Sequence, residues 1–315
     1  MRAPDFWYAT DSGAQILAAL LSPLGFLYGA SVAWKSSHAT PYRARAKVVC
    51  VGNLTVGGTG KTPVAIAIAE ALIKRGKKIC FLSRGYGGSR KMATRVTADM
   101  TAMDVGDEPL LLAQAGPTIV AANRAEGARL ADDNGADVII MDDGHQNFSL
   151  EKDISLVVVD GETSFGNGCV VPAGPLREPV KQGLARADMV IVVGNGKHDF
   201  PRPVLQAKLE ALPTQLSGAR VVAFAGIGRP EKFFQSLPTL GLQLVETRSF
   251  GDHHVYSAAE IDDLKNFAQR KGAQLVTTEK DYLRLSPEKR TGITAIPVRA
   301  TFSDSAMLQG LLDRL

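Results

Sequence analysis

The sequence predicts an α/β protein in which helices cover both faces of a parallel sheet, followed by a smaller α/β unit. Short, continuously apolar segments alternate with helical patterns along the chain, and this alternation is typical of a buried parallel sheet. At 315 residues, the chain is long enough for about two domains. We therefore expect a first domain over residues 1–214 and a second over residues 215–315 that contributes to the active-site cleft.

An apolar segment without charged residues covers residues 16–34. Its length approaches the ~20 apolar residues that cross a bilayer, but Pro23 interrupts it, and Asp5 and Asp11 precede it. Aromatic residues flank the segment and basic residues follow it, as is typical at a membrane surface with anionic lipids. We predict a membrane-associated helix over about 13–35 that lies in the interface. A helix packed on a soluble domain and a transmembrane span are the alternatives.

A glycine-rich turn joins an apolar strand at residues 48–52 to a helix that begins at Lys61. Glycines let backbone N–H groups surround phosphate oxygens, Lys61 can reach the β- and γ-phosphates, and the Thr62 hydroxyl can hold Mg²⁺. The usual P-loop has glycine where this chain has Thr55, so the turn is a variant, and the first domain is expected to be P-loop NTPase-like. An ordinary strand-to-helix turn is the alternative. The predicted nucleotide-binding residues are Asn53, Thr55, Val56, Gly57, Gly58, Thr59, Gly60, Lys61 and Thr62.

Further apolar segments predict the remaining strands. Those of the first domain are expected at 78–82, 118–121, 138–141, 154–159 and 189–193, and those of the second at 220–225, 275–278 and 295–299. Residues 201–216 contain three prolines and are expected to connect the two domains. Ligands of parallel sheets bind outside the carboxyl ends of the strands. Polar residues that follow the strands are therefore candidate site residues.

Two pairs of carboxylates stand at such positions. Asp142 and Asp143 follow an apolar strand, where acidic residues accompany a P-loop and hold Mg²⁺; two solvated loop aspartates are the alternative. Asp107 and Glu108 precede an apolar helix. An aspartate there can act as the base for a hydroxyl nucleophile, although capping of the helix explains the pair equally well.

Two further charged motifs are candidates. Arg177 and Glu178 lie between prolines, where Arg177 could stabilise phosphate charge and Glu178 could assist a metal ion; a surface ion pair is the alternative. His253 and His254 follow Asp252, and adjacent side chains of an extended chain point in different directions. At most one of them is expected to face a shared site, where it could tune a carboxylate. A pair of surface histidines is the alternative, and no zinc-site spacing is present.

The net charge and the cysteine spacing restrict the partners that the sequence predicts. The formal net charge is +4, and no basic stripe with interleaved aromatic residues is present, so nucleic acid is not an expected partner. Cys50, Cys80 and Cys169 have no paired metal-ligand spacing. They are interpreted as small core residues in a reducing compartment.

These motifs together resemble the tetraacyldisaccharide 4′-kinase (lipid A 4′-kinase) family. The matching motifs run in order through residues 52–63, 83–87, 106–109, 142–144, 174–179, 252–254 and 278–281. The resemblance implies phosphorylation, dependent on ATP and Mg²⁺, of the 4′-hydroxyl of a tetraacylated glucosamine disaccharide 1-phosphate, giving lipid IVA. It further implies action at the cytoplasmic face of the bacterial inner membrane, with a monotopic or peripheral attachment through the N-terminal helix.

The resemblance also implies roles for individual residues. Lys61 and Thr62 would contact phosphate and metal, and Arg177 would sit near the phosphates. Asp107 would be the general base with His253 as its partner. The metal-side carboxylates would be Asp143 and Glu178, supported by Asp142.

One motif departs from the family pattern, which usually continues Asp-Asp-Gly-Phe-Gln-His. This chain has His145 in place of the aromatic residue and Asn147 in place of the histidine. Asparagine cannot titrate near neutral pH, so an acid or base role at position 147 is in doubt.

Two other classes of protein are compatible with a P-loop. A GTPase or regulatory NTPase at the membrane would be expected to carry Asn-Lys-x-Asp after a late strand, and residues 195–199 are out of register with that motif. A nucleotide-binding adaptor without catalytic activity would leave Asp107, Glu178 and His253 unexplained.

Overall fold

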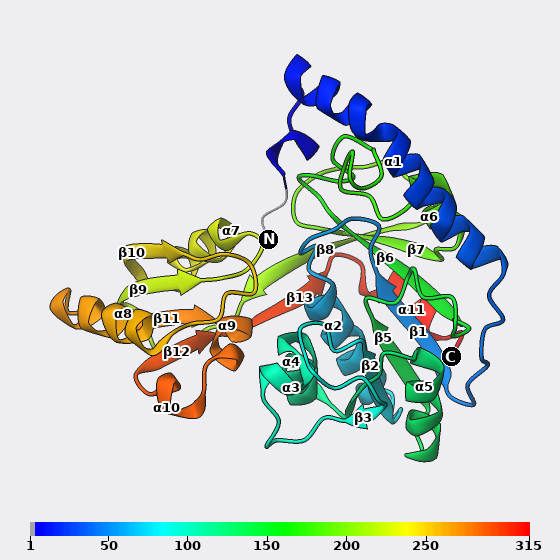
Figure 1. Ribbon diagram of the computed structural model, residues 1–315. Coiled ribbons are helices and arrows are strands. Elements are labelled where there is room, and N and C mark those ends of the chain that lie inside the picture. The colour runs from blue at the N-terminus through cyan, green and yellow to red at the C-terminus, as the bar shows by residue number, and fades with distance from the viewer. Residues whose placement is uncertain (1–3) are drawn as a thin grey trace.

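Two β-sheets form the framework of the computed structural model, which describes residues 4–315 (Figure 1). The large sheet has nine strands in the order β13-β8-β7-β6-β1-β5-β2-β4-β3, and the small sheet has four in the order β10-β9-β11-β12. All strand pairs are parallel except β13 with β8 and β3 with β4. This architecture confirms the predicted α/β class.

The strands of the large sheet are β1 (Lys47–Gly52), β2 (Ile79–Ser83), β3 (Thr94–Arg95), β4 (Thr118–Val120), β5 (Val138–Asp142), β6 (Ile154–Asp160), β7 (Met189–Val193), β8 (Val204–Ala211) and β13 (Val298–Phe302). The helices of this unit are η1 (Asp5–Trp7), α1 (Ser12–Ser37), α2 (Lys61–Lys74), α3 (Ala102–Val105), α4 (Asp107–Ala115), α5 (Arg124–Asp133), α6 (Val180–Ala185) and α11 (Ser305–Leu312). The second unit contains β9 (Arg220–Ala225), α7 (Pro230–Ser236), η2 (Pro238–Leu240), β10 (Gln243–Ser249), α8 (Ala258–Arg270), β11 (Gln274–Thr278), α9 (Glu279–Arg284), α10 (Pro287–Arg290) and β12 (Ile293–Ile296).

Strand β1 lies between β5 and β6, and all three run in the same direction. Connections that leave such a strand on opposite sides open a crevice beyond its carboxyl end. The glycine-rich turn follows β1 and therefore begins at this crevice. Asp142 ends the neighbouring strand β5, so the acidic strand end lies beside the turn.

Helices cover both faces of the large sheet, because alternate strand residues point to opposite sides. On one face, Val49 and Ile140 belong to a core that includes Leu72 of α2 and residues of α4 and α11. On the other face, Cys50 and Ile139 pack with alanines of α5. The small sheet has the same arrangement, with α7 on one face and α8 on the other.

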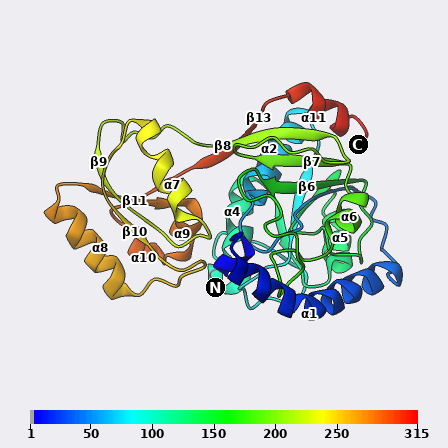
Figure 2. The same cartoon turned by 90° about the horizontal axis from the view of Figure 1, so that it is seen from above.

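Two strands carry the chain between the units. β8 extends from the large sheet toward the second unit, and β13 returns antiparallel to it, pairing from Val298 with Ala211 to Phe302 with Ala207 (Figures 1 and 2). Residues 201–216, expected to connect the two domains, also contain β8, a strand of the large sheet, because the prolines of this segment stand outside the strand.

The strand expected over 295–299 is instead divided at Pro297 into β12 of the small sheet and β13 of the large sheet. The division of the chain at residue 214 stays a prediction. In the structure, β13 pairs with the large sheet and α11 packs in its core, although that division assigns both to the second unit.

Helix α1 lies along the outside of the first unit (Figure 2). Its buried residues are mostly small: Ala14, Ala18, Gly25, Gly29 and Val32. A Cβ added at Gly25 would stand 2.6 Å from the Val170 carbonyl oxygen, so glycine allows this close approach. The large apolar side chains point outward; those exposed are Ile16, Leu17, Leu20, Leu24, Phe26, Leu27, Tyr28 and Trp34. By length and composition, α1 is long and apolar enough to cross a membrane.

Candidate active site

The glycine-rich turn is fixed on one side and open on the other. Thr55 forms an antiparallel bridge with Leu176 and has no left-handed backbone, which explains why this position does not require glycine. Gly57 (φ +112°) and Gly60 (φ +83°) do take backbone conformations that favour glycine. A Cβ placed at Gly57 or Gly58 would meet no atom within 4 Å beyond its chain neighbours. The turn therefore leaves room for a phosphate group beside its glycines.

Lys61 and Thr62 begin α2, and both are buried. The Thr62 hydroxyl donates a hydrogen bond of 3.1 Å to Asp142 Oδ2, while the buried Oδ1 of Asp142 has no hydrogen-bond partner among the described residues. Burial, together with the Glu108 carboxylate, raises the pKa of Asp142 to about 7. A buried, unpartnered carboxylate oxygen beside a hydroxyl fits a hard divalent cation such as Mg²⁺, which prefers oxygen ligands.

Asp143 lies where two cations meet. Its Oδ1 is 2.7 Å from Arg177 Nη1 and 3.6 Å from Lys61 Nζ. Burial works to raise the pKa of Asp143, but the charges of Lys61 and Arg177 outweigh it and hold that pKa well below its usual range. Asp143 also takes a left-handed backbone (φ 54°), which is uncommon outside glycine and clusters at functional sites. Asp143 is therefore an ionised carboxylate held between Arg177 and Lys61.

Glu178 is buried but faces a different set of groups. Both of its carboxylate oxygens accept hydrogen bonds from Arg186 Nη2, at 2.7 and 2.6 Å, and Gln146 Nε2 donates to Oε1 at 2.9 Å. Gln146 also donates to the Asn53 carbonyl oxygen at the start of the turn. Glu178 thus braces the glycine-rich turn through Gln146. The motif does not form a surface ion pair, since Arg177 and Glu178 have different partners.

Asp107 lies at the first turn of α4 and meets the second unit. His253 Nδ1 is 3.4 Å from Asp107 Oδ2, and Arg284 Nε donates to the same oxygen at 3.0 Å. Burial works to raise the pKa of Asp107, but the hydrogen bond with His253 and the charges of Lys280 and Arg284 hold it well below its usual range. The Asp107 hydrogen bond raises the pKa of His253. His253 is one of the few non-glycine residues here with a left-handed backbone (φ 57°).

The residues around Asp107 show which histidine faces it and how the two units meet. His254 Nε2 is 3.0 Å from Glu260 Oε1 within the second unit, so only His253 faces Asp107. Glu108 pairs with Lys280 of α9, with 2.7 Å between Oε1 and Nζ. A Cβ added at Gly228 would stand 3.7 Å from Gly58 N, which places the β9–α7 loop against the glycine-rich turn.

The two positions that depart from the family motif have structural contacts. His145 is fully buried, with Nδ1 3.0 Å from Ser155 Oγ and Nε2 2.9 Å from the Gly183 carbonyl oxygen. Burial lowers its pKa to about 4, so the ring is neutral at pH 7. Asn147 Oδ1 accepts hydrogen bonds from Ser149 N and Oγ within a turn. Among the described residues, neither side chain forms a hydrogen bond with Asp107, Asp142 or Asp143.

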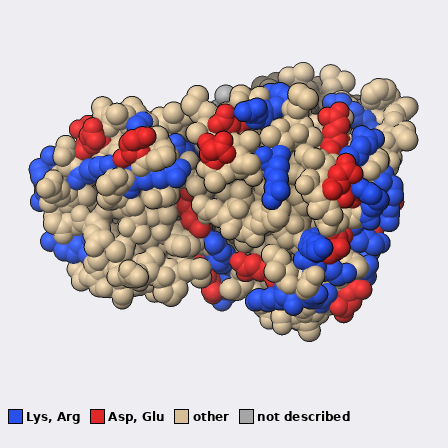
Figure 3. All heavy atoms as spheres, turned by 90° about the horizontal axis from the view of Figure 1, so that it is seen from below, with Lys and Arg blue, Asp and Glu red and all other residues tan. Residues whose placement is uncertain are grey.

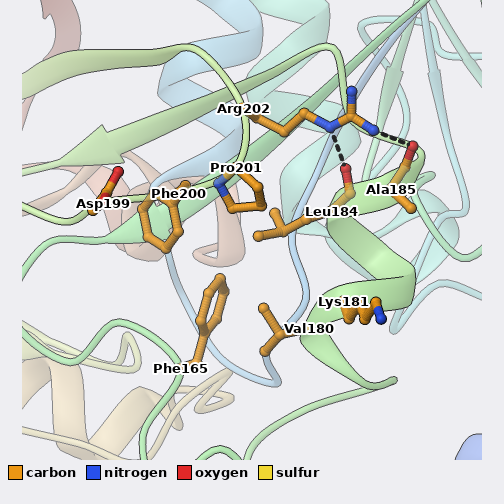
Figure 4. A pocket seen from close by; sticks show the side chains of 9 residues that line it. All are labelled: Phe165, Val180, Lys181, Leu184, Ala185, Asp199, Phe200, Pro201 and Arg202. Atoms are coloured by element: carbon orange, nitrogen blue, oxygen red, sulfur yellow. Dashed lines mark hydrogen bonds between the residues drawn. The ribbon is translucent and has the colours of Figure 1, made fainter.

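Two further observations concern where metal ions and ligands could bind. Within residues 4–315, no three His, Cys, Asp or Glu side chains are gathered into a cluster that could hold a metal by itself. A hollow of about 640 Å³ lies between α6 and the loop at 199–202 (Figure 4). Its lining, which includes Phe165, Leu184 and Phe200, contains none of the candidate residues, so we place the site at the crevice beyond β1 instead.

Comparison with known proteins agrees with this geometry. The family model described as tetraacyldisaccharide-1-P 4′-kinase matches residues 17–315. The chain belongs to this kinase family.

Curated members of this kinase family are similar over their whole length. The tetraacyldisaccharide 4′-kinase of Rhodospirillum rubrum is 47% identical, with 100% of this chain and 98% of the relative aligned. The same enzyme of Maricaulis maris is 48% identical over 99% of this chain and 96% of the relative. The solved structure of the kinase LpxK from Aquifex aeolicus in complex with ATP is 27% identical, with a TM-score of 0.79, and the match covers 95% of this chain and 99% of that one.

The kinase fold brings together most of the residues singled out in the sequence, while their roles stay predictions. Lys61, Thr62, Asp142, Asp143 and Arg177 lie in one connected group at the turn. Asp107 meets His253, as the resemblance implied. Glu178 lies outside this group of direct contacts and reaches the turn through Gln146.

Several charged residues of the site carried no local signal in the sequence. Arg124, at the start of α5, is buried with its Nε unpartnered among the described residues, and burial together with the Arg84 charge lowers its pKa to about 10. Arg229 and Lys232 of the second unit each lie 3.0 Å from Asp160, at the end of β6. A position directly after a strand could have marked Asp160. No local pattern links Arg229 or Lys232 to Asp160, which lies 69 and 72 residues earlier in the chain.

Proposed function

We propose that the chain transfers the γ-phosphoryl group of ATP to the 4′-hydroxyl of a tetraacylated glucosamine disaccharide 1-phosphate, giving lipid IVA for lipid A synthesis. The observation that carries this proposal is the contact between Asp107 and His253, contributed by different units, beside an open phosphate-binding turn. Glu108, next to Asp107, interacts electrostatically with Lys61, so the candidate base and the turn belong to one charge network. Membership of the kinase family and the ATP complex of the Aquifex aeolicus relative support the choice of substrates.

The turn and its neighbours bind and orient the nucleotide. ATP supplies the phosphoryl group, and Mg²⁺ supplies positive charge that offsets the charge of the phosphates. Thr62 and Asp142 would hold the metal, because their oxygens meet at the end of β5, and Asp143 is the next residue in the chain. Lys61 and Arg177 would stabilise charge on the transferred group, since both already face Asp143 at the open side of the turn.

Asp107 orients the acceptor hydroxyl and receives its proton. The acceptor oxygen forms a bond to the γ-phosphorus while its O–H bond breaks and the proton moves to the Asp107 carboxylate. The bond between the γ-phosphorus and the oxygen shared with the β-phosphate breaks, and ADP leaves. His253 Nδ1, 3.4 Å from Asp107 Oδ2, can share that proton. Asp107 belongs to the first unit and His253 to the second, so docking of the two units would assemble the base and exclude water.

We further propose that α1 attaches the protein to the cytoplasmic face of the bacterial inner membrane. Helices on soluble domains bury their large apolar residues, whereas α1 buries small ones and exposes leucine and aromatic side chains. The face seen from below carries interspersed acidic and basic side chains (Figure 3). This polarity suits an enzyme that takes a lipid acceptor from the bilayer and ATP from the cytoplasm.

Labelled ATP incubated with the protein and the disaccharide lipid tests the proposed activity. Transfer of label to the lipid is the expected result. Nucleotide hydrolysis without transfer would instead support a GTPase or regulatory NTPase, and a preference for GTP would strengthen that alternative.

Flotation with vesicles of anionic lipid tests the membrane proposal. Replacing Leu20 and Leu24, which are 72% and 55% exposed, with aspartate is expected to abolish flotation without lowering the melting temperature. The matched control is Ile73→Asp on α2, an exposed apolar residue remote from α1. Deleting residues 1–35 should give the same loss together with weaker use of the lipid acceptor. Normal flotation and normal acceptor kinetics after that deletion would contradict the proposal.

A further inference from the structure

Arg284 lies at the contact between the two units, and its guanidinium is divided between them. The side chain is 7% exposed and ends α9. Nη1 donates hydrogen bonds to Asp281 Oδ1 at 2.7 Å and to the Gly226 carbonyl oxygen at 2.6 Å, both within the second unit. Nε donates to Asp107 Oδ2 of the first unit at 3.0 Å, and Nη2 contacts the same oxygen. Arg284 therefore bridges the second unit and the candidate base.

The inner half of this bridge is rigid because Asp281 is saturated with hydrogen bonds. Asp281 is fully buried and accepts from Tyr256 Oη at 2.9 Å, from Gly226 N at 3.0 Å and from Thr278 Oγ1 at 2.6 Å. Guanidinium is planar, so fixing Nη1 also fixes the edge formed by Nε and Nη2. The second unit thus presents one preset edge of Arg284 to Asp107.

The same edge also faces His253. Arg284 Nη2 is 3.3 Å from His253 Nδ1, which is itself 3.4 Å from Asp107 Oδ2. One ring nitrogen cannot donate to Asp107 and accept from Arg284 at the same time. A protonated Nδ1 can donate to Asp107, and a bare Nδ1 can accept from Arg284. The three side chains can therefore keep one arrangement in both protonation states of His253.

We propose that Arg284 is a positioning residue for phosphoryl transfer: it fixes Asp107 and His253 in one arrangement once the second unit has docked. This inference rests on the proposed function, in which Asp107 takes the proton of the acceptor hydroxyl. Arg284 acts through Asp107. It also gives a role to the motif at residues 278–281, because Thr278 and Asp281 hold Arg284 in place.

Other charged groups also face Asp107, so removing Arg284 should have a partial effect on its ionisation. Lys280 and His253 lower the pKa of Asp107, and Glu108 is its neighbour in α4. Asp252 Oδ1 lies 3.9 Å from His253 Nε2, on the far side of the ring. Loss of Arg284 leaves these groups in place while the burial of Asp107 continues to raise its pKa. More of the enzyme should then carry a protonated, inactive Asp107 in mild acid.

The test is the pH dependence of kcat/KM for Arg284→Met against the wild-type enzyme, with labelled ATP and the disaccharide lipid. An opposite charge near a carboxylate lowers the carboxylate pKa by about one to three, so removing the charge reverses part or all of that change. The acidic limb of the kcat/KM profile, where activity falls as Asp107 is protonated, should therefore shift to higher pH. At neutral pH, kcat should fall about tenfold to 100-fold because Asp107 is no longer held in place. Arg284→Gln is the second variant, in case Arg284→Met does not fold. It keeps an N–H₂ group for Asp281 without the charge, and it should also shift the acidic limb to higher pH.

Arg290→Met is the matched control. Arg290 lies in the second unit and donates only to the carbonyl oxygens of Tyr282, Leu283 and Leu285 in the described structure. Its loss should lower the melting temperature and leave the acidic limb in place.

A double variant separates positioning from a purely structural role. Adding Arg284→Met to Asp107→Asn should cost little further activity, because residues that act as a unit are non-additive. Multiplied losses in the double variant, or an unmoved acidic limb in both Arg284 variants, would overturn the inference. Absence of transfer by the wild-type enzyme would instead overturn the proposed function.

Discussion

The two sides of the site differ in how their polar groups are satisfied. On the nucleotide side, Gly57 and Gly58 face open space, and the buried atoms Asn53 Oδ1, Thr59 Oγ1 and Asp142 Oδ1 have no hydrogen-bond partners among the described residues. On the side of the second unit, Asp107 and Glu108 are both paired with basic side chains. The nucleotide side therefore has polar atoms without protein partners, whereas the carboxylates on the side of the second unit are paired within the protein.

This difference indicates which partner each side of the site binds. A buried polar atom without a partner costs about 1–3 kcal/mol, so a ligand that supplies partners at the turn gains affinity from relieving that cost. Buried carboxylates need their partners in the folded protein, because an uncompensated buried charge is strongly destabilising. The nucleotide side is thus organised for ligand binding, and the other side for docking of the second unit. Four substitutions test this comparison.

The largest effect is expected from Asp107→Ala on the paired side. Loss of the base should lower kcat about 10²–10⁴-fold while ATP binding changes little, because the ion pairs of Asp107 among the described residues are with His253 and Arg284 of the second unit. Steady-state kinetics and equilibrium binding of ATP measure the two quantities. Asp133→Ala, which removes an exposed partner of Arg45, is the control. Retained turnover would show that Asp107 is not the base.

Lys61→Met should have the next largest effect, on the open side. Removing a preorganised cation is expected to lower kcat about 10²–10³-fold, and ATP binding should weaken as well. Calorimetric titration with ATP and turnover measurements report both changes. Lys74→Met, at the exposed end of the same helix, should behave like the wild type. Unchanged ATP binding by Lys61→Met would remove Lys61 from the cradle.

Asp142→Asn tests whether the unpartnered oxygen serves the metal. Asparagine has the same shape and can still accept from Thr62, so the fold should be kept. The Mg²⁺ concentration for half-maximal activity is expected to rise about tenfold to 100-fold at saturating ATP. Glu178→Gln provides the comparison, because Glu178 makes no direct contact with Thr62 or Asp142 in the described structure and should alter the Mg²⁺ requirement less. The opposite order would support Glu178 as the metal carboxylate.

Lys232→Met should have the smallest effect. Lys232 is partly exposed and joins the second unit to the buried Asp160, which keeps Arg229 as a second partner, so its loss should cost no more than the about 0.2–1 kcal/mol of an exposed ion pair. We therefore expect kcat/KM for the lipid acceptor to fall about twofold to fivefold. The difference from the wild type should shrink at high salt, which screens exposed charges. A loss that does not depend on salt would assign Lys232 a role other than docking.

The sequence revealed the open side of the site better than the paired side. The turn and Asp142 are contiguous with their strands, so the local pattern marks both the residues and their position at the sheet edge. Arg284 and Asp107 are 177 residues apart, and a single arginine in a short helix has no local pattern that indicates its partner. Glu178 was predicted on the metal side, yet its cationic partner is Arg186, eight residues along the chain.

The fold shows the same limit. Continuous apolar runs revealed the central strands, because burial on both faces leaves a strong pattern. β8 alternates in burial and lies between prolines, and β13 follows β12 after one residue, so neither its sheet nor its direction could be predicted locally. Sheet membership of β13 depends on a pairing with residues about ninety positions earlier in the chain.

The pairing of β8 with β13 has a consequence for the order in which the protein forms during synthesis. The edge of β8 can be covered only after the whole second unit has left the ribosome, since β13 follows it in the chain. Leu308 and Leu312 of α11 join the core of the first unit at the same late stage. Until then, the nascent first unit exposes a strand edge and an apolar patch, which are surfaces that chaperones recognise. Completion of the kinase core is thereby delayed until the residues that would assemble its catalytic base already exist.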